Sequence, residues 1–396
     1  MMINIAILGF GVVGSGVAEV IKMNSETLAA RLSGEKLHVK YIFDRKTFPG
    51  HELNDRVTTD FDKIINDEEV LIVVETMGGA DFAYECAKKA LCAGKSVVTS
   101  NKECVAKYGY ELLKLARENN VSYLFEASVG GGIPIIRPMW QCLAANEILS
   151  VAGILNGTTN FILTKMIRDN ESFETALKQA QSLGYAEANP TADIEGHDTC
   201  RKICILASLA FGYHVFPEQV HCEGIMNVSL PDIFCASKLG YGIKLIGKTE
   251  KTPDGVYVIT CPSLVKREDT LAGINDVYNG IEVTGNAVEK VTFCGRGAGK
   301  IPTASAVMAD VLDIIRDCKK NIGWEYTDKK FLCDYKNYKL KYFVRTNDEN
   351  AKNYFDLSGC YQKDGEYAFI THKDTEKNLD GLLEKINIIS KIRVLL

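Results

Sequence analysis

The chain has 396 residues, a length that predicts two or three domains, each with its own core. Its apolar fraction of 46% and charged fraction of 24% are typical of a soluble globular protein. The formal net charge of -5 at pH 7 argues against a broad nucleic-acid surface, which requires clustered Lys and Arg. No apolar run approaches the ~20 residues that span a bilayer, and the first strand follows no basic leader. We therefore expect a cytoplasmic protein with neither a nucleic-acid nor a membrane partner.

Thirteen cysteines are scattered along the chain without a Cys-x-x-Cys pair, which fits reduced thiols in the cytosol. Cys200 and Cys204 are spaced i,i+4 on a predicted helix, and His197 and His214 are close in sequence. Such a grouping is open to metal binding, but packing of the helix in the core is the favoured interpretation.

Strands and helices alternate over residues 3–126. The predicted strands are Ile3–Leu8, Val39–Phe43, Val70–Glu75, Ser96–Thr99 and Ser122–Glu126. The predicted helices are Gly14–Met23, Ala83–Ala93 and Gly109–Asn119. This alternation predicts an α/β fold with a doubly wound, Rossmann-type parallel sheet.

The middle of the chain changes character after a glycine-rich turn at 128–134. We predict a strand at Ile148–Leu155, and helices at Phe161–Asp169, Phe173–Leu183 and His197–Phe211. Shorter β-type segments follow, among them Val256–Thr260 and Val288–Phe293, before a second glycine-rich turn and a helix at Ala304–Cys318. The tail from Asn321 predicts strands at Tyr338–Arg345 and Glu366–Thr371, a helix at Thr375–Ile389 and a last strand at Ser390–Leu396.

The first strand ends in a G-x-G-x-x-G motif that opens a helix, the context in which this motif is meaningful. Gly9 permits the tight turn, Gly11 lets the backbone approach a pyrophosphate, and Gly14 lets helix pack on strand. The pyrophosphate would lie at the helix N-terminus, which favours anions. An ordinary strand-to-helix turn is the alternative.

The second strand ends in Asp44-Arg45-Lys46, which leaves the choice between NAD and NADP open. An acid at this point binds the adenine-side ribose of NAD, whereas Arg or Lys accommodates the extra phosphate of NADP. Asp44 would repel that phosphate unless Arg45 and Lys46 face it, and it is alternatively a plain turn residue. We expect NAD to be at least as good a cofactor as NADP.

Six segments, in this order and spacing, resemble the homoserine dehydrogenase family up to about residue 320: GFGVVG, VVTSNK, EASVGGGIPII, GILNGTTNFIL, GYAEANPTADIEGHDTCRK and GRGAGKIPTASAV. Asn189 departs from the family, which often has Asp there, and residues 75–79 match more loosely. The resemblance implies NAD(P)H-dependent reduction of L-aspartate 4-semialdehyde to L-homoserine, in the biosynthesis of threonine, methionine and isoleucine. It also implies a homodimer or homotetramer.

Hydride reduction of an aldehyde leaves an alkoxide, which an ammonium group stabilises and protonates. The resemblance assigns this role to Lys202, with Asp198 orienting either that donor or the bound substrate, and with Lys102 as a second catalytic or substrate-orienting lysine. Asp198 and Lys202 share a helix face, although such pairs are usually solvated surface ion pairs. The alternative interpretation of Lys102 is a residue that begins a helix and points to solvent.

The resemblance also assigns binding residues. Glu187 would hold the α-ammonium group of the substrate by a charge-assisted hydrogen bond, near Gly184 and Thr158. The cofactor-binding residues would be Gly9, Phe10, Gly11, Val12, Val13, Gly14, Asp44, Arg45, Thr76, Ser100, Lys102 and Gly297. Main-chain carbonyls would hold a structural Na⁺ at Glu126, Val129, Gly131 and Ile133.

Three domains follow from these assignments. Residues 1–130, completed by 295–320, would bind the nucleotide, and residues 131–294 would form an α+β domain for substrate binding, catalysis and dimerisation. Residues 321–396 resemble a degenerate ACT-like α+β module, in which Thr346–Asn350 replaces the usual Pro- and Gly-containing first loop. Threonine feedback through this tail and a role in assembly alone are both open.

Two other functions remain as alternatives. Aspartate-semialdehyde dehydrogenase would need an activated cysteine, and no cysteine lies beside a His in a suitable glycine-rich or helix-starting context. A Rossmann-type redox sensor that binds NAD(H) without chemistry would have no use for Lys102, Glu187, Asp198 and Lys202 together.

Overall fold

The computed structural model describes residues 2–316, 323–357 and 359–396. It divides the chain into two compact units. Unit 1 consists of Met1–Ala145, Ile205–Phe216 and Arg296–Thr327, and unit 2 of Asn146–Cys204, Pro217–Gly295 and Asp328–Leu396. No helix among the described residues is long and apolar enough to cross a membrane.

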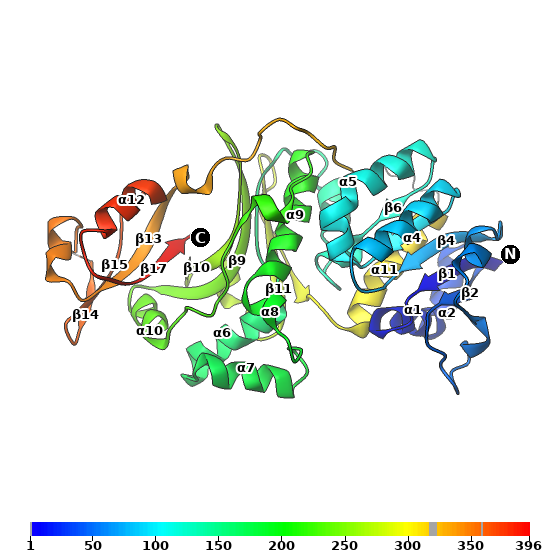
Figure 1. Ribbon diagram of the computed structural model, residues 1–396, viewed down its shortest axis with the longest axis horizontal. Helices are drawn as coiled ribbons and strands as arrows, with labels where there is room; N and C mark the ends of the chain where they lie inside the picture. The colour runs from blue at the N-terminus through cyan, green and yellow to red at the C-terminus, as the bar shows by residue number, and fades with distance from the viewer. Residues whose placement is uncertain (1, 317–322, 358) are drawn as a thin grey trace. The chain divides into compact units, whose positions relative to one another are not determined.

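A six-stranded parallel sheet forms the centre of unit 1 (Figure 1). Its strands are β1 Met2–Leu8, β2 Lys36–Phe43, β3 Val57–Thr58, β4 Val70–Glu75, β5 Ser96–Thr99 and β6 Tyr123–Leu124. The order β3-β2-β1-β4-β5-β6 is that of the Rossmann fold, with its reversal point between β1 and β4. The predicted doubly wound fold is confirmed.

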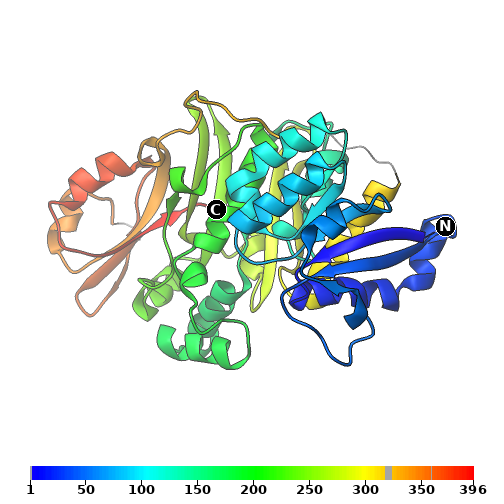
Figure 2. The ribbon, with the colours of Figure 1, turned by 45° about the vertical axis from the view of Figure 1, so that its right-hand side comes forward.

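Helices cover both faces of this sheet. They are α1 Val12–Met23, α2 Ser25–Arg31, α3 Phe61–Ile65, α4 Asp81–Cys92, α5 Lys102–Glu118 and α11 Lys300–Ile315. Helix α1 packs on α11 and α4 packs on α5, and the right-handed crossovers put these pairs on opposite faces (Figures 1 and 2). Helix α11, which follows the second glycine-rich turn, therefore packs on the parallel sheet of unit 1.

Helix α5 begins at Lys102, well before the predicted start at Gly109. Asn101 caps it, because its side-chain oxygen accepts a hydrogen bond from Cys104 N at 3.1 Å. Gly109 lies inside the helix, where a Cβ would approach a ring carbon of Trp324 to 2.8 Å. The glycine therefore marks a packing contact and not a helix start. Cys318, the predicted end of the later helix, lies outside the described residues.

Unit 2 is built on an eleven-stranded mixed sheet. Its main order is β12-β11-β7-β9-β10-β17-β13-β15-β14, with β8 beside β10 and β16 beside β13. The strands are β7 Ile148–Ile154, β8 His221–Cys222, β9 Tyr241–Thr252, β10 Gly255–Lys266, β11 Tyr278–Gly285, β12 Glu289–Arg296, β13 Lys339–Thr346, β14 Tyr361–Lys363, β15 Glu366–Ile370, β16 Asp374–Thr375 and β17 Ile388–Val394. The helices are α6 Gly157–Asp169, α7 Phe173–Ser182, α8 Thr191–Ile194, α10 Leu230–Lys238, α12 Glu376–Leu383 and the first part of α9 His197–Phe211, whose residues from Ile205 onward belong to unit 1.

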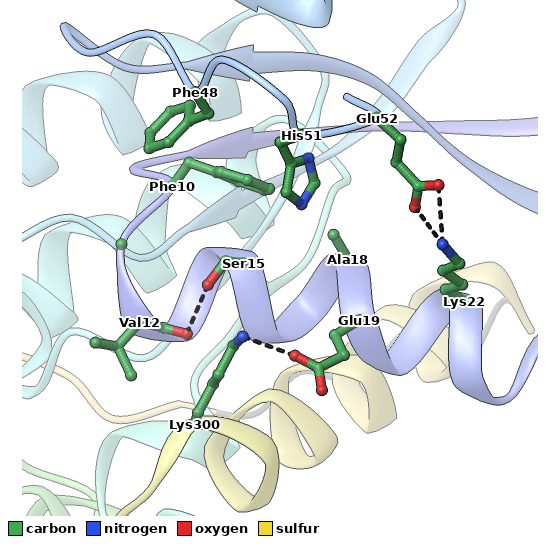
Figure 3. Close-up of a pocket in the computed structure, with 11 residues that line it drawn as sticks. Phe10, Val12, Ser15, Ala18, Glu19, Lys22, Phe48, His51, Glu52 and Lys300 are labelled. Atoms are coloured by element: carbon green, nitrogen blue, oxygen red, sulfur yellow. Dashed lines mark hydrogen bonds and ion pairs between the residues drawn. The ribbon is translucent and has the colours of Figure 1, made fainter. Parts of the chain in front are cut away.

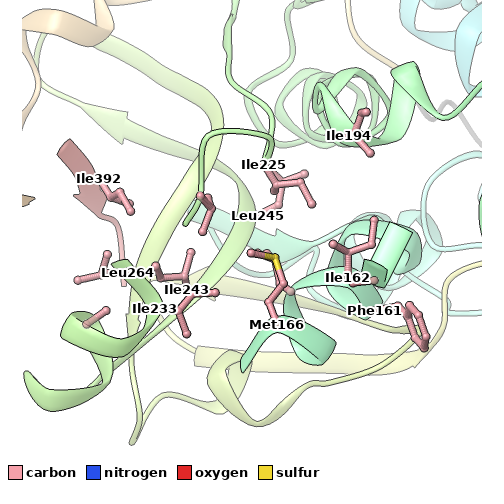
Figure 4. Packing of buried hydrophobic residues seen from close by; sticks show 14 of the residues in the cluster. Phe161, Ile162, Met166, Ile194, Ile225, Ile233, Ile243, Leu245, Leu264 and Ile392 are labelled. Carbon is pink, nitrogen blue, oxygen red and sulfur yellow. The ribbon is translucent and has the colours of Figure 1, made fainter. Parts of the chain in front are cut away.

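The core of unit 2 draws on distant parts of the chain. Figure 4 shows Met166 of α6 close to Ile243 of β9, in a buried cluster that also contains Ile392 of β17. Strand β17 pairs with β10 in parallel, so the last strand of the tail continues the sheet of the middle segment. From Asp328 onward, the tail therefore shares both sheet and core with the rest of unit 2.

The predicted helix Thr375–Ile389 is too long. Helix α12 ends at Leu383, and Ile388 and Ile389 belong to β17. Between the end of α12 and the start of β17, Asn387 N donates a hydrogen bond to Oδ2 of Asp348, a residue far away in sequence, at 3.3 Å. Tertiary hydrogen bonding therefore overrides the local helical pattern.

A neutral histidine is buried in unit 1. His214 is 3% exposed, and its Nδ1 accepts a hydrogen bond from Trp324 Nε1 at 2.7 Å. Because an indole N–H only donates, Nδ1 carries no proton and Nε2 carries it. Burial lowers the pKa of His214 to about 4.

We expect this histidine to destabilise the fold in mild acid. As the pH falls below the ordinary His pKa of 6.5, His214 is protonated in the unfolded chain while it stays neutral in the folded protein. The free energy of unfolding that is present above pH 6.5 is therefore lost as the pH falls toward 4. Between pH 7 and pH 5 the free energy of unfolding should fall by about 2 kcal/mol through this group. Urea unfolding of wild type and His214→Gln at both pH values measures it. An equal pH dependence in the two proteins would show that His214 is not buried as the neutral form.

Candidate active site

The glycine loop between β1 and α1 has the geometry that dinucleotide binding requires. Gly9 has a φ of +84°, which L side chains rarely adopt. A Cβ on Gly14 would lie 2.0 Å from Gly9 O, so close packing of α1 on β1 requires glycine. A Cβ on Gly11 would meet nothing within 4 Å, so the protein's own packing does not require glycine there. This open space fits the approach of a pyrophosphate to the N-terminus of α1.

A pocket of about 640 Å³ runs along α1 beside this loop (Figure 3). Its lining includes Gly11, Lys300 of α11, and Phe48 and His51 from the segment after β2. The rings of Phe48 and His51 both meet Phe10 edge-on, with centroids 5.1 Å away. Figure 3 shows the charged lining groups joined in two ion pairs. The segment after β2 therefore covers one side of the glycine loop.

Asp44 lies at the end of β2, as predicted, and its carboxylate is bound to backbone. Oδ2 accepts a hydrogen bond from Phe10 N at 2.8 Å, and Oδ1 accepts one from Lys46 N at 2.9 Å. Asp44 is half-buried, whereas Arg45 and Lys46 are exposed. Asp44 thus shapes the glycine loop, a role that the sequence did not reveal.

Three other predicted residues lie at the C-terminal edge of the same sheet, where open α/β sheets bind ligands. Thr76 follows β4, and its Oγ1 donates to Gly9 O at 2.7 Å. Ser100 follows β5, and Lys102 is the half-buried first residue of α5. The sequence did not single out Glu75, a carboxyl buried at this edge whose pKa burial raises to about 7.

The predicted sodium loop, residues 126–133, is tightly constrained. The Glu126 carboxylate accepts hydrogen bonds from the N–H groups of Ile135, Ile136 and Arg137, which occupy both of its oxygens. Gly131 has a φ of +57°, and a Cβ there would lie 2.3 Å from Gly297 O. The segment with Gly297 therefore packs directly on this loop.

Side chains offer no alternative metal site among the described residues. No group of three or more His, Cys, Asp or Glu there could hold a metal ion. Cys200 and Cys204 are 3% and 0% exposed, as core packing of their helix predicts.

The predicted pair Asp198 and Lys202 is buried on α9. Lys202 Nζ lies 2.8 Å from Asp198 Oδ2, with only 9% and 7% of the two side chains exposed. Lys202 Nζ also donates to Leu155 O at 2.7 Å, where the chain leaves β7. A buried pair held to backbone is not the solvated surface ion pair that this spacing usually indicates.

Asn156 connects this pair to the start of α6. Its Oδ1 accepts a hydrogen bond from Thr159 N at 2.8 Å, which makes it the cap of α6. Its Nδ2 donates to Asp198 Oδ2 at 2.9 Å and to Asp193 Oδ1 at 2.6 Å. Asn156 therefore orients Asp198. The sequence placed Asn156 in the segment GILNGTTNFIL, which resembles the family, but assigned its side chain no role.

The first turn of α6 contacts the segment that contains the predicted substrate residues Gly184 and Glu187. Thr158 Oγ1 donates to Tyr185 O at 2.6 Å, which holds the segment from Gly184 to Glu187 against the helix. Glu187 is exposed, and its carboxylate has no hydrogen-bond or ion-pair partner among the described residues. It is therefore available to a cationic ligand.

The predicted residues thus form two groups. The glycine loop, Asp44, Arg45, Thr76, Ser100, Lys102, Gly297 and the sodium loop belong to unit 1. Thr158, Gly184, Glu187, Asp198 and Lys202 belong to unit 2.

Two family models match the chain. The NAD-binding domain of homoserine dehydrogenase matches residues 9–126, and the homoserine dehydrogenase model matches residues 134–312. The chain belongs to the homoserine dehydrogenase family. The resemblance predicted from the motifs is confirmed, and with it an NAD(P)-dependent oxidoreductase.

Curated relatives and solved structures agree with the homoserine dehydrogenase assignment. The homoserine dehydrogenase of Helicobacter pylori is 38% identical, over 98% of this chain and 96% of the relative. That of Synechocystis sp. is 43% identical over 80% of this chain and 74% of the relative. The homoserine dehydrogenase structure from Thiobacillus denitrificans has a TM-score of 0.90 at 34% identity, covering 100% of this chain and 98% of that one. A hyperthermophilic archaeal homoserine dehydrogenase in complex with NADPH has a TM-score of 0.68 at 28% identity, covering 80% and 98%.

Proposed function

We propose that the chain reduces L-aspartate 4-semialdehyde to L-homoserine with NADH or NADPH, and that Lys202 donates the proton to the new alcohol. The buried contact of Lys202 with Asp198 and Leu155 O carries the assignment of the proton donor. The family supports the reaction, since both curated relatives above are homoserine dehydrogenases.

The reduction places negative charge on the former aldehyde oxygen. The nicotinamide cofactor, when bound, supplies the hydride. An ammonium group beside that oxygen stabilises the charge and then protonates it. Asp198 and Leu155 O fix the position of Lys202 Nζ, and burial strengthens the electrostatic effect of its charge.

Glu187 would bind the α-ammonium group of the substrate, because its carboxylate is exposed and otherwise uncommitted. Thr158 and Gly184 would shape the same site, since the Thr158 hydroxyl holds the segment that Gly184 begins. Lys102 would be a second catalytic or substrate-orienting lysine, at the ligand-binding edge of the parallel sheet.

Oxidation of L-homoserine by NAD⁺ or NADP⁺ tests this proposal in the reverse direction. We expect reduced cofactor to form readily from L-homoserine and far more slowly from 4-hydroxybutyrate, which lacks the amino group. Equal rates would contradict ammonium recognition. An aspartate-semialdehyde dehydrogenase or a redox sensor would oxidise neither alcohol.

The cofactor would contact the glycine loop, the end of β2, the C-terminal edge of the sheet and the second glycine-rich turn. The residues are Gly9, Phe10, Gly11, Val12, Val13, Gly14, Asp44, Arg45, Thr76, Ser100, Lys102 and Gly297. Of these, Asp44 would decide between NAD and NADP, because its fixed carboxylate would repel the additional phosphate of NADP.

We expect wild type to use NADH at least as well as NADPH, and Asp44→Asn to shift the kcat/KM ratio toward NADPH. Asparagine removes the charge but keeps one oxygen for Phe10 N, so the glycine loop keeps its shape. Asp44→Ala, which loses both hydrogen bonds, is the comparison that separates charge from loop shape. A wild type that prefers NADPH tenfold, with no further gain in Asp44→Asn, would show that Asp44 does not face the phosphate.

A structural Na⁺ would bind the main-chain carbonyls of Glu126, Val129, Gly131 and Ile133. Hard cations prefer oxygen ligands, and glycine lets carbonyls converge. The constrained loop supports this site, because three backbone N–H groups hold the Glu126 side chain and so fix the backbone that would carry the ligand carbonyls.

We also propose a domain organisation. Residues 1–130 with 295–320 would bind the nucleotide, residues 131–294 would bind substrate and pair subunits into a homodimer or homotetramer, and residues 321–396 would form a degenerate ACT-like module. The tail supports this through β13, β15, β17 and α12, which form one antiparallel group with a helix. The family's metabolic role favours a cytoplasmic location.

A further inference from the structure

A second lysine is buried in unit 2, on β9. Lys244 is 2% exposed, and its Nζ donates to Asn160 Oδ1 at 2.9 Å, Ile274 O at 2.5 Å and Asn275 Oδ1 at 3.1 Å. All three acceptors are neutral, and no carboxylate among the described residues lies within 4.0 Å of this Nζ. A buried ammonium without a carboxylate is costly, so a lysine at this position points to a role beyond filling space.

The three acceptors match the three protons of an ammonium group. Burial lowers the pKa of Lys244 to about 8, with Arg168 lowering it further and Asp276 opposing both. The protonated form therefore still dominates at pH 7. A neutral amine has only two protons and would lose its hydrogen bond to one of the three oxygens.

Lys244 joins α6 to the segment that leads into β11. Asn160, on α6, is 1% exposed, and its Nδ2 donates to Ile274 O at 3.2 Å and Tyr278 O at 3.0 Å. Lys244 Nζ bonds to both Asn160 and Ile274. One ammonium group thus fixes α6, β9 and this segment at a single point.

That point lies one turn from the proposed active site. Asn156 caps α6 and donates to Asp198, and Thr158, in the first turn, holds the segment that contains Glu187. A shift of α6 would move both side chains together, because they belong to the same helical turn.

We propose that Lys244 is a positioning residue: it holds the first turn of α6 so that Asn156 orients Asp198 and Thr158 orients the Glu187 segment. The inference rests on the proposed roles of Asp198 and Glu187. Lys244 itself contacts α6 and the neighbouring segment, and acts on the reaction only through them.

Lys244→Met tests the inference, with Lys248→Met as the matched control. Lys248 lies on the same strand, but its Nζ contacts Leu395 O and Glu250 and not α6. We expect Lys244→Met to lower kcat/KM for aspartate semialdehyde by about tenfold or more, the consequence of losing hydrogen bonds to a charged group. The KM for the cofactor should stay within about twofold, as should every constant of Lys248→Met. Equal behaviour of the two variants would overturn the proposal.

Two further measurements keep the test decisive. Amide hydrogen exchange at Thr159 and Asn160 should accelerate about tenfold in Lys244→Met and not in Lys248→Met. Unchanged exchange would overturn the positioning role whatever the substrate proves to be. If Lys244→Met does not fold, Asn275→Ala removes one half-buried acceptor and should change substrate kcat/KM and exchange in the same direction by a smaller factor.

A double variant separates positioning from general destabilisation. If Lys244 acts through the first turn of α6, Asn156→Ala combined with Lys244→Met should lose less kcat than the product of the two single losses. Losses that multiply would show that the two residues act independently.

Discussion

Replacement of Lys202 by alanine is expected to lower kcat at least ~100-fold, the lower end of what general acid catalysis contributes. The variant loses the ammonium group that would stabilise and protonate the alkoxide. The KM for the cofactor should change little, because the glycine loop belongs to unit 1 and Lys202 to unit 2. Steady-state kinetics in both cofactors measure the effect.

The matched control is Lys165→Ala on α6. Lys165 forms an ion pair of the same i,i+4 spacing and the same 2.8 Å length with Asp169, but at the surface. Surface pairs contribute little, so this variant should keep wild-type turnover. If Lys202→Ala also turns over within a few-fold of wild type, Lys202 is not the proton donor.

Replacement of Glu187 by glutamine should raise the KM for aspartate semialdehyde about 30-fold, equivalent to about 2 kcal/mol for a hydrogen bond to a charged group. The change keeps the size and removes the charge that would pair with the α-ammonium group. A loss of ground-state binding acts on KM more than on kcat.

Succinate semialdehyde, which lacks the amino group, provides the control for Glu187. Wild type should discriminate strongly against it, and Glu187→Gln should discriminate poorly. A variant that still rejects succinate semialdehyde as strongly as wild type does would place ammonium recognition on another residue.

The sequence predicted the parallel sheet well because buried strands are continuous apolar runs. Val70–Glu75 and Ser96–Thr99 were predicted with the bounds that the structure has. The long strand β9 was missed, because its polar residues Lys244 and Lys248 break the apolar pattern and find partners only in the folded chain. The end of α12 was wrong for the same reason, since Asp348 binds Asn387 across a long stretch of sequence.

The sequence likewise predicted some features of the candidate site and not others. The i,i+4 spacing of Asp198 and Lys202 predicted their shared face, which their hydrogen bond confirms. Their burial and their contacts with Leu155 and Asn156 were not predictable, because those partners precede α9 by many residues and spacing says nothing about them. Asp44 was placed correctly at the end of β2, but its hydrogen bond to Phe10 N depends on how the glycine loop folds back.

The most direct test of the proposed function is the forward reaction with product identification. The purified chain is mixed with L-aspartate 4-semialdehyde and either NADH or NADPH, and cofactor oxidation and L-homoserine are measured in the same sample. The account predicts cofactor oxidation that depends on the aldehyde, with one L-homoserine formed for each cofactor oxidised. No oxidation with either cofactor, or oxidation without homoserine, would contradict it.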